Sequence, residues 1–167
     1  MEESSAIAYN ENNVYCGKSS KRYGGRAYFA KHNFQRGDII MHGFGKIIDH
    51  QTKHISIQVG PNRHYLPTKW AGRYWNHSCD PNCFARTRSD SFPDMIALRS
   101  IKKGEEITYS YFMTEFSWSS HAHEKRIFCL CGALKCFKKI PSFFRLTDKQ
   151  KNNLKKRKII SSYLRNT

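Results

Sequence analysis

Short apolar runs separated by turn-forming residues fill the first two thirds of the chain. They fall at residues 13–18, 26–32, 38–48, 54–59, 64–68, 95–101 and 105–112. Gly, Asp, Asn and Pro lie between them, and stretches such as QRGD at 35–38 and KKGEE at 102–106 have the composition of tight turns. The runs are short and rich in β-branched and aromatic residues, as strands are. The pattern therefore predicts a mainly β fold with few short helices.

The end of the chain has a different pattern. Residues 138–167 contain ten Lys or Arg and a single acidic residue. Thr147 or Asp148 could cap a helix, and apolar residues follow at roughly helical spacing, at Leu154, Ile160 and Leu164. We expect a basic helix here. It could bind nucleic acid or another acidic partner, or be a solvated helix docked by a thin apolar stripe, and the pattern does not separate the two.

Composition and charge narrow the function classes. The 167 residues are 39% hydrophobic and 14% aromatic, as in one folded domain rather than a disordered tail. Twenty-nine Lys and Arg against thirteen Asp and Glu give a formal charge of +16, which favours acidic partners. No apolar run approaches the ~20 residues of a membrane span. The N-terminal sequence MEESSAIAYNENN is unlike a signal peptide, so we expect an intracellular protein of nucleus or cytoplasm, with no membrane partner.

Three of the six cysteines lie close together in the sequence. Cys129, Cys131 and Cys136 occur in CLCGALKC, where Gly132 can relax the backbone of a chelating turn. Clustered thiols of an intracellular protein are typical zinc ligands, and a structural zinc site needs four. Cys79 is a good candidate for the fourth, and the others are His77, Cys83, His121 and His123. Buried cysteines without a metal are the weaker interpretation, because thiols in a polar loop would be open to oxidation.

Three motifs follow one another in the second half of the chain, NHSCDPN at 76–82, GEEITYSY at 104–111 and CLCGALKC at 129–136. Together, and in this order, they resemble the SET-domain protein lysine methyltransferases with a post-SET zinc loop. The resemblance implies a SET β-clip fold, in which small curved sheets surround a C-terminal pseudoknot. In that pseudoknot the segment with Tyr109 and Tyr111 passes under the loop with Asn76 and His77.

The resemblance also divides the chain. The expected parts are an N-terminal tail at 1–11, the SET domain at 12–116, the post-SET zinc loop at 117–141 and a basic C-terminal helix or tail at 142–167. The segment from Asp49 to Trp70, which would help to read the substrate, is short. Many members of the family carry an aromatic residue at the place of Gly43, so we expect the wall of the lysine channel to differ here.

By this resemblance the methyl donor is S-adenosylmethionine. GRAYFAKHNFQRGDII at 25–40 is similar to the family's first cofactor-binding stretch, with Ala27 in place of a second glycine. The implied cofactor-binding residues are Gly25, Arg26, Ala27, Asn76, His77, Phe128 and Leu130. Asn76 offers a donor and an acceptor on one short side chain, and Phe128 and Leu130 could cover the adenine. The implied structural zinc ligands are Cys79, Cys129, Cys131 and Cys136.

Two tyrosines match the catalytic positions of the family. The hydroxyl of Tyr111 would order the amine and the methyl group and stabilise the positive charge in transit. Tyr109 occupies a position that carries either Tyr or Phe, and a tyrosine there leaves less room for added methyl groups. We therefore expect mainly monomethylation. Alternate aromatic residues on a strand are more often one packed face, which is the structural alternative.

The leading hypothesis is a protein-lysine N-methyltransferase that acts on a histone or another chromatin- or nucleic-acid-associated protein. A chain of charge +16 repels a free basic peptide, so a lysine on an acidic or nucleic-acid-bound protein is favoured. Two alternatives remain. One is a catalytically weak SET-like zinc module that binds nucleic acid, and the other is a methyltransferase for a small amine. The sequence gives no oligomeric state.

Overall fold

The structure is a computed structural model that describes residues 2–21, 25–52, 55–68, 72–117 and 128–167. Most elements in these ranges are short strands, as the sequence pattern predicts. The strands are β1 (Val14–Lys18), β2 (Arg26–Ala30), β3 (Ile39–His42), β4 (Gly45–Ile48), β5 (Ile57–Gly60), β6 (Arg63–Pro67), β7 (Asn76–His77), β8 (Cys83–Thr87), β9 (Pro93–Ala97) and β10 (Thr108–Tyr109). The helices are α1 (Glu3–Asn13), α3 (Asp148–Lys156) and the 3₁₀ helices η1 (Tyr111–Met113), η2 (Phe143–Arg145) and η3 (Ser162–Asn166).

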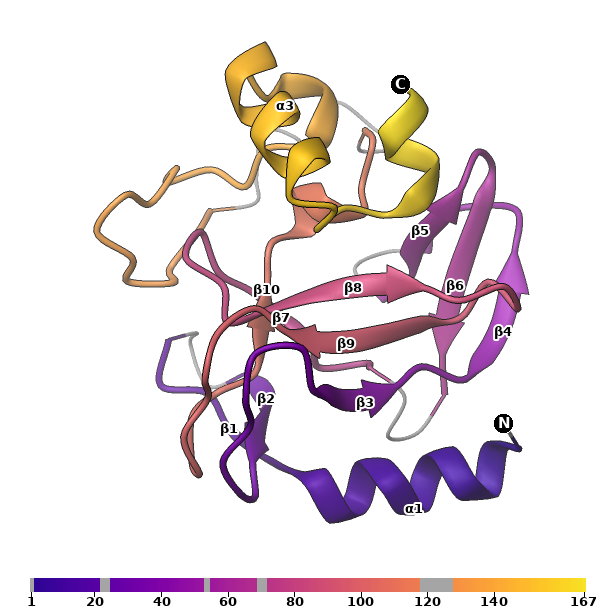
Figure 1. Cartoon of the computed structure of the whole chain (residues 1–167), viewed down its shortest axis with the longest axis vertical. Helices are drawn as coiled ribbons and strands as arrows, with labels where there is room; N and C mark the ends of the chain where they lie inside the picture. The colour runs from indigo at the N-terminus through magenta and orange to yellow at the C-terminus, as the bar shows by residue number, and fades with distance from the viewer. Residues whose placement is uncertain (1, 22–24, 53–54, 69–71, 118–127) are drawn as a thin grey trace.

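The strands form several small sheets instead of one large sheet (Figure 1). β1 pairs with β2, β9 lies between β3 and β8, and β6 lies between β4 and β5, all in antiparallel register. The remaining pair, β7 with β10, is parallel and only two residues long. Parallel neighbours need a crossover connection, and here β8 and β9 form part of it. The predicted mainly β fold with few helices is confirmed.

The tight turns lie where glycine permits them. Gly37 has φ 96° in the QRGD stretch, and Gly104 has φ 82° in the KKGEE stretch. The N–H of Asp38 donates to the carbonyl of Gln35 at 3.1 Å, which closes the first turn. A positive φ is nearly free of cost only for glycine, so these two positions end one strand and aim the next.

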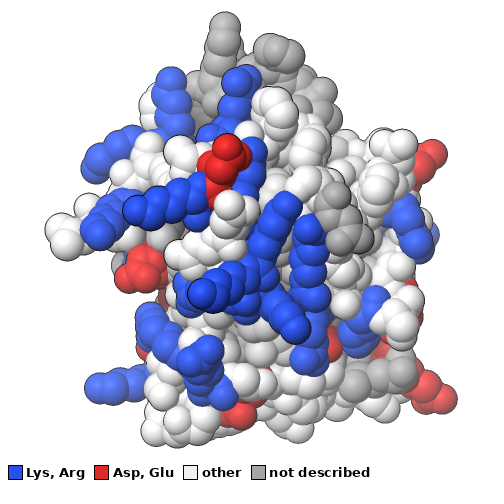
Figure 2. Space-filling model, turned by 45° about the horizontal axis from the view of Figure 1, so that its top comes forward, with Lys and Arg blue, Asp and Glu red and all other residues white. Residues whose placement is uncertain are grey.

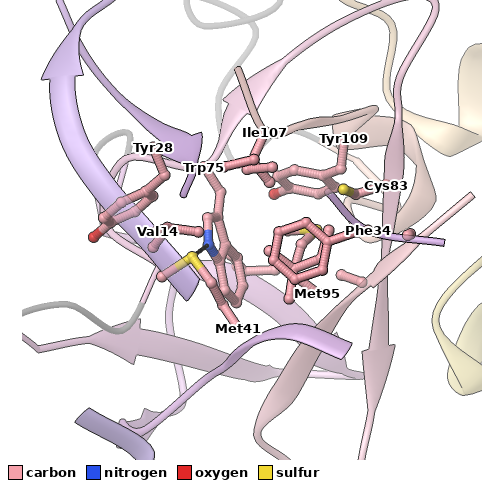
Figure 3. Packing of buried hydrophobic residues seen from close by; sticks show 14 of the residues in the cluster. Val14, Tyr28, Phe34, Met41, Trp75, Cys83, Met95, Ile107 and Tyr109 are labelled. Carbon is pink, nitrogen blue, oxygen red and sulfur yellow. Dashed lines mark hydrogen bonds between the residues drawn. The ribbon is translucent and has the colours of Figure 1, made fainter. Parts of the chain in front are cut away.

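The main hydrophobic core lies between the small sheets (Figure 3). Trp75 lies in the middle of this core and is 4% exposed. Its indole N–H points at the sulfur of Met41, 3.1 Å away. A second cluster lies under the C-terminal segment and includes Phe112, Phe143, Ile160 and Leu164. Of the catalytic candidates, Tyr109 belongs to the first cluster and Tyr111 packs against it. The core therefore fixes the backbone from which the candidate site projects.

Helix α1 at residues 3–13 covers most of the expected N-terminal tail at 1–11 and the first two residues of the expected SET domain, and the hydrophobic pattern did not indicate it. Its side chains are largely exposed, and it is held by polar contacts to β3. The Asn10 side chain donates to the carbonyl of His42 at 2.8 Å and accepts from the N–H of His42 at 2.7 Å. Asn13 donates to the carbonyl of Ile40 at 3.0 Å. These side chains act as a partner for the strand edge, and they have no apolar periodicity to detect.

Gly43 has a packing role. Its N–H donates to the carbonyl of Pro93 at 2.7 Å, and a Cβ at Gly43 would lie 2.4 Å from that oxygen. The neighbouring Phe44 is 6% exposed and belongs to the main core. The close backbone approach therefore excludes any larger side chain at Gly43, which explains why this position departs from the family's aromatic residue.

The predicted basic C-terminal helix is confirmed, but it is shorter than the apolar spacing suggested. Thr147 and Gln150 form a capping box, in which the Thr147 hydroxyl accepts from the N–H of Gln150. The helix ends at Lys156, and Lys158 adopts φ 55°. Ile160 and Leu164 lie beyond this end and are buried in the second cluster. They anchor the segment after the helix and do not form a stripe along it.

Candidate functional site

The candidate site lies where β7 and β10 run side by side. Thr108 lies opposite Asn76, and Tyr109 lies opposite His77. Just beyond the strands, the N–H of Ser78 donates to the carbonyl of Tyr109 at 3.0 Å. Two segments more than thirty residues apart in the sequence thus share one short ladder. This is the contact that the predicted pseudoknot requires.

His77 connects Tyr111 to the cysteine loop. Its Nδ1 accepts from the N–H of Tyr111 at 3.1 Å, so the ring proton lies on Nε2. That nitrogen lies 3.3 Å from the sulfur of Cys79 and donates to it. The imidazole also packs edge-on against the Tyr111 ring, with 5.1 Å between the ring centroids. One neutral imidazole therefore fixes the backbone of Tyr111 relative to Cys79.

The two tyrosines form an aromatic wall with Trp75. The centroids of Tyr109 and Tyr111 are 5.2 Å apart, and those of Trp75 and Tyr109 are 6.5 Å apart. Tyr109 is 2% exposed, whereas Tyr111 is half-buried and its hydroxyl donates to the carbonyl of Trp75 at 3.3 Å. Such a wall lowers the pKa of an amine by desolvation while its ring faces attract the ammonium.

The side-chain amide of Asn76 connects this residue to β2, the strand that is expected to bind the cofactor. The nitrogen donates to the carbonyl of Arg26 and to the carboxylate of Glu106, each at 3.0 Å. Glu106 accepts a second hydrogen bond from the Ser19 hydroxyl at 2.8 Å. The amide nitrogen thus serves as a link inside the protein. Glu106, the second glutamate of the GEEITYSY motif, was not among the predicted site residues, although the motif contained it.

The Gly25, Arg26 and Ala27 stretch lies beside this link. Ala27 is fully buried in β2, opposite Gly17 of β1, and its φ is not in the left-handed region. The methyl group of Ala27 is therefore tolerated where the family often has glycine. The Arg26 guanidinium lies 6.0 Å from the centroid of the Tyr74 ring.

Four cysteines converge at the other side of His77. The sulfurs of Cys79, Cys129, Cys131 and Cys136 all lie within 4.8 Å of one another. Cys79 is 3.6 Å from Cys129 and 4.0 Å from Cys136, sulfur to sulfur. All four cysteines are free thiols in the structure. Four converging sulfurs of this kind could hold a tetrahedral metal ion, for which zinc is the usual choice.

Backbone N–H groups point at these sulfurs, as in sites that stabilise thiolates. The N–H groups of Cys79 and Ala133 each lie 3.5 Å from the sulfur of Cys131. Burial disfavours the Cys131 thiolate, but these N–H groups, together with hydrogen bonds from the Cys129 and Cys136 thiols, outweigh burial and lower the pKa of Cys131 to about 6. Burial raises the pKa of Cys129 to about 11. The cluster thus has a first thiolate at neutral pH, from which metal binding can begin.

The alternative fourth ligands are not placed alike. Cys83 is fully buried in the main core, which separates it from the cluster. His77 lies next to Cys79 but uses both ring nitrogens in hydrogen bonds. His121 and His123 lie outside the described residues. Within the part that the structure describes, the sole group of metal-ligand side chains found is the four-cysteine cluster.

Phe128 and Leu130 flank Cys129 and project from the protein. Phe128 is 67% exposed and Leu130 is 43% exposed. The N–H of Cys129 donates to the carbonyl of Lys138 at 2.8 Å, so the loop closes on itself. Exposed apolar side chains on a closed loop suit a surface that a ligand covers.

Asn82 and Glu115 are two buried polar residues that the sequence interpretation did not assign to the site. Asn82 accepts from the N–H of Thr108 at 2.8 Å and donates to the carbonyl of Glu106 at 2.8 Å, which holds β10 in place. Glu115 is 3% exposed and its N–H donates to the carbonyl of Tyr111 at 2.8 Å. Burial raises the pKa of Glu115 to about 7. Asn82 is the last residue of the NHSCDPN motif, whereas Glu115 lies outside all three motifs.

Glu115 connects the turn after Tyr111 to the segment that follows β4. Its carboxylate accepts from the N–H of Gln58 at 2.9 Å and from the side chain of Gln51 at 3.1 Å. Its carbonyl accepts from the N–H of Phe143 at 2.8 Å. Three segments distant in sequence therefore meet at this one buried residue.

No helix in the described part of the chain has the length and apolar character that crossing a bilayer requires.

Curated proteins similar to this chain are named as histone methyltransferases. The chain is 32% identical over 146 residues to human Histone-lysine N-methyltransferase 2D, an alignment that covers 77% of this chain and 2% of that protein. It is 32% identical over 127 residues to Histone-lysine N-methyltransferase, H3 lysine-4 specific, of Aspergillus oryzae, covering 65% of this chain and 10% of that protein. The chain thus spans a small fraction of the length of these relatives.

The family match covers the site itself. Residues 25–112, more than half of the chain, match the family described as SET domain. This range begins at Gly25 and contains β2, the β7–β10 pair and both candidate tyrosines. The chain belongs to the SET-domain family.

Proposed function

We propose that this chain is an S-adenosylmethionine-dependent protein-lysine N-methyltransferase. The observation that carries the proposal is the β7–β10 pair, which puts Tyr109 and Tyr111 beside Asn76 and His77. The family membership and the names of the relatives support the same reaction. A methyltransferase of this kind needs a cofactor surface and an aromatic acceptor channel that meet, and these residues form the two sides of such a meeting point.

The cofactor would lie against β2 and β7, held by Gly25, Arg26 and Ala27 on one side and by the loop of Asn76 and His77 on the other. Its sulfonium would supply an electrophilic methyl group. Phe128 and Leu130 would cover the adenine from the cysteine loop, since both are exposed there. The fit rests on the exposed apolar pair and on the hydrogen bond from Asn76 to the Arg26 carbonyl, which joins the two cofactor segments.

The Tyr111 hydroxyl would orient the incoming amine of the substrate lysine. Free lysine has a pKa near 10.4, so nearly all of it is protonated at neutral pH, and the aromatic wall favours the neutral form by desolvation. Once the proton has left to water, the amine is held in line for attack, and proximity supplies much of the rate. Tyr109 is buried next to Tyr111, where its hydroxyl would leave less room for added methyl groups, and we therefore propose that monomethylation predominates.

A structural zinc ion would join Cys79 to the CLCGALKC loop. The donor set of four cysteines and the N–H groups aimed at their sulfurs fit this ion. The hydrogen bond from His77 to Cys79 would orient that ligand from outside the coordination sphere. The ion would have a structural role, since four protein ligands leave no open position for catalysis.

The substrate that fits best is a lysine on a chromatin protein, and the protein would then act in the nucleus. The relatives are named for histones, and the +16 charge disfavours a free basic tail unless nucleic acid neutralises it. We propose that the basic segment 142–167 contacts the phosphates of nucleic acid while the site engages the lysine. Replacement of the exposed Lys149, Lys156 and Arg157 by Gln, which leaves the buried residues of this segment in place, should then weaken methylation of nucleosomes and spare methylation of a short peptide.

The decisive experiment measures transfer of a labelled methyl group from S-adenosylmethionine to nucleosomes and to free histones. Zinc-replete wild type should label a discrete lysine. Tyr111→Phe should lower the rate by about 10²–10³, the usual effect of losing one positioned donor. Tyr15→Phe, which removes the hydroxyl of an exposed tyrosine on β1, is the matched control and should retain the rate.

Two other functions would give different results. A nucleic-acid-binding module would bind labelled cofactor weakly or not at all and would transfer no label to any protein. A small-amine methyltransferase would label polyamines faster than it labels histones. Either result would overturn the proposal of a protein-lysine methyltransferase.

A further inference from the structure

The 3₁₀ helix η2 places one phenylalanine in the core and the next in solvent. Phe143 is 1% exposed and belongs to the second cluster, whereas Phe144 is 56% exposed. The N–H of Phe144 donates to the carbonyl of Phe116 at 2.9 Å, and the two rings lie 5.9 Å apart, centroid to centroid. An exposed aromatic ring on an anchored backbone is therefore held in a defined position.

Two cations flank this exposed ring. The Lys151 ammonium lies 5.7 Å from the centroid of Phe144, and the Arg145 guanidinium lies 5.9 Å from it. Lys155 lies one turn further along α3 on the same face as Lys151. The ion pairs found among the described residues all lie outside 147–158, although the Lys155 ammonium donates to the carbonyl of Thr167. Figure 2 turns this end of the molecule toward the viewer and shows Lys and Arg gathered across the face with few acidic side chains.

We propose that Phe144, with Arg145 and Lys151, is a stacking site for an unpaired base of single-stranded nucleic acid. Non-specific single-strand sites combine a basic track for the phosphates with aromatic rings for the bases, because every base has a face to stack. A duplex hides these faces and would use only the charges. An acidic peptide would likewise use the charges and would have no need of the ring.

The position of η2 connects this surface to the candidate active site. The N–H of Phe143 donates to the carbonyl of Glu115, and the N–H of Glu115 donates to the carbonyl of Tyr111. A strand that stacks on Phe144 would thus be held next to Phe143, which two successive hydrogen bonds connect to Tyr111. The inference extends the proposed contact between the basic segment and nucleic acid, and it names single strands as the preferred form.

The test is equilibrium binding of fluorescent oligothymidine and of a duplex of equal length, measured by anisotropy on the full zinc-replete chain without cofactor. Phe144→Ala should weaken single-strand binding about tenfold, the usual loss for one stacked base, and change duplex binding less than about twofold. Phe144→Tyr should retain single-strand affinity. Leu134→Ala is the matched control, because Leu134 is a fully exposed apolar residue on the cysteine loop, and it should bind both as wild type does.

A second variant separates charge from stacking. Lys151→Gln should reduce the slope of log affinity against log salt by about one for both nucleic acids, because it removes one phosphate contact. If Phe144→Leu, which keeps the apolar volume, bound single strands as tightly as wild type, stacking would be excluded. Equal losses on single strand, duplex and polyglutamate in Phe144→Ala would also overturn the proposal, since they would mean that the ring only supports the basic surface.

This result is independent of the proposed catalytic activity. Methylation of a short peptide, measured on the same Phe144→Ala preparation, should equal that of wild type. If wild type did not methylate the peptide, the proposed methyltransferase activity would be refuted, and the binding result would stand. If Phe144→Ala weakened single-strand and duplex binding equally, the stacking site would be refuted, and the proposed methyltransferase activity would stand.

Discussion

The two halves of the candidate site are held together by different physical means. The β7–β10 pair borders a core of nineteen buried residues, and buried amide and carboxylate groups fix its register. The four-cysteine loop has only Cys129, Cys131 and Ile140 as its buried cluster, and it exposes Phe128 and Leu134. Apolar burial can stabilise the first half, but the second has too little of it and depends on its sulfurs. The two halves of the candidate site thus have separate sources of stability.

A Cys→Ser substitution can be made in each half, and we expect the largest effect from the one in the cysteine loop. Cys131→Ser should lower zinc affinity at least about 100-fold and raise amide exchange of residues 129–140, because structural zinc contributes about 10–16 kcal/mol to such loops. The strands β3, β8 and β9 should keep their protection. Zinc affinity is measured by competition with a chromophoric chelator, and exchange by mass spectrometry.

Cys83→Ser is the counterpart in the main core, where Cys83 is fully buried. It should leave zinc affinity unchanged and lower the free energy of unfolding by about 1–3 kcal/mol, the cost of burying a poorly satisfied hydroxyl. Urea unfolding of both variants checks the pair. Equal loss of global stability and of zinc affinity in the two variants would show that the halves form one cooperative unit.

An intermediate effect is expected at Glu115, which lies between the halves. Burial raises the pKa of Glu115 from 4.5 to about 7, so the folded protein favours the protonated carboxyl group. The protonated Glu115 carboxyl group therefore contributes about 3 kcal/mol to the free energy of unfolding. This contribution is complete below pH 4.5, is lost as the pH rises toward 7 and is absent above pH 7. Glu115→Gln stays neutral, so it should gain about that much stability relative to wild type between pH 5 and pH 8.

Urea unfolding of wild type and Glu115→Gln at pH 5, 6, 7 and 8 measures this difference. The exposed Glu11→Gln is a suitable control and should follow wild type at every pH. If wild type and Glu115→Gln ran parallel across this range, the buried carboxyl group would not bind its proton in the folded protein.

The smallest effect concerns the C-terminal helix, which belongs to neither half. Thr147→Ala removes one side of the capping box and should weaken α3 by about 1 kcal/mol. Amide exchange of residues 151–157 should rise about fivefold, while β7 and the cysteine loop stay unchanged. Thr147→Ser retains the hydroxyl and should behave as wild type. A change in zinc affinity in Thr147→Ala would show that the basic segment supports the loop.

The sequence predicted those features that local chemistry determines. Short apolar runs indicated the strands, and the glycines of QRGD and KKGEE marked turns that Gly37 and Gly104 form. The motif order, through the family resemblance, predicted the meeting of Tyr109 with His77. The cysteine spacing predicted three of the converging sulfurs, and the resemblance predicted Cys79 as the fourth. The roles of the individual site residues remain predictions.

What the sequence did not predict depends on contacts between distant segments. Helix α1 is held on β3 by hydrogen bonds from Asn10 and Asn13. Its sequence therefore has no periodic apolar face that would have predicted a helix. Glu115 became notable only when Gln51 and Gln58 were found around its carboxylate. The early end of α3 follows from the burial of Ile160 after the helix, a tertiary contact that overrides the continuing helical spacing.

The separation of Cys79 from Cys129 by 50 residues sets the order in which the molecule can mature. When a ribosome has released Cys79, the other three sulfurs of the cluster have not yet been made. The β8–β9 hairpin is synthesised in between, and its two strands can pair through short-range contacts before the loop arrives. If the cluster holds zinc as we propose, metal capture would follow the pairing of β8 with β9, so newly made chains in a zinc-poor cell would have this hairpin but an unformed cysteine loop.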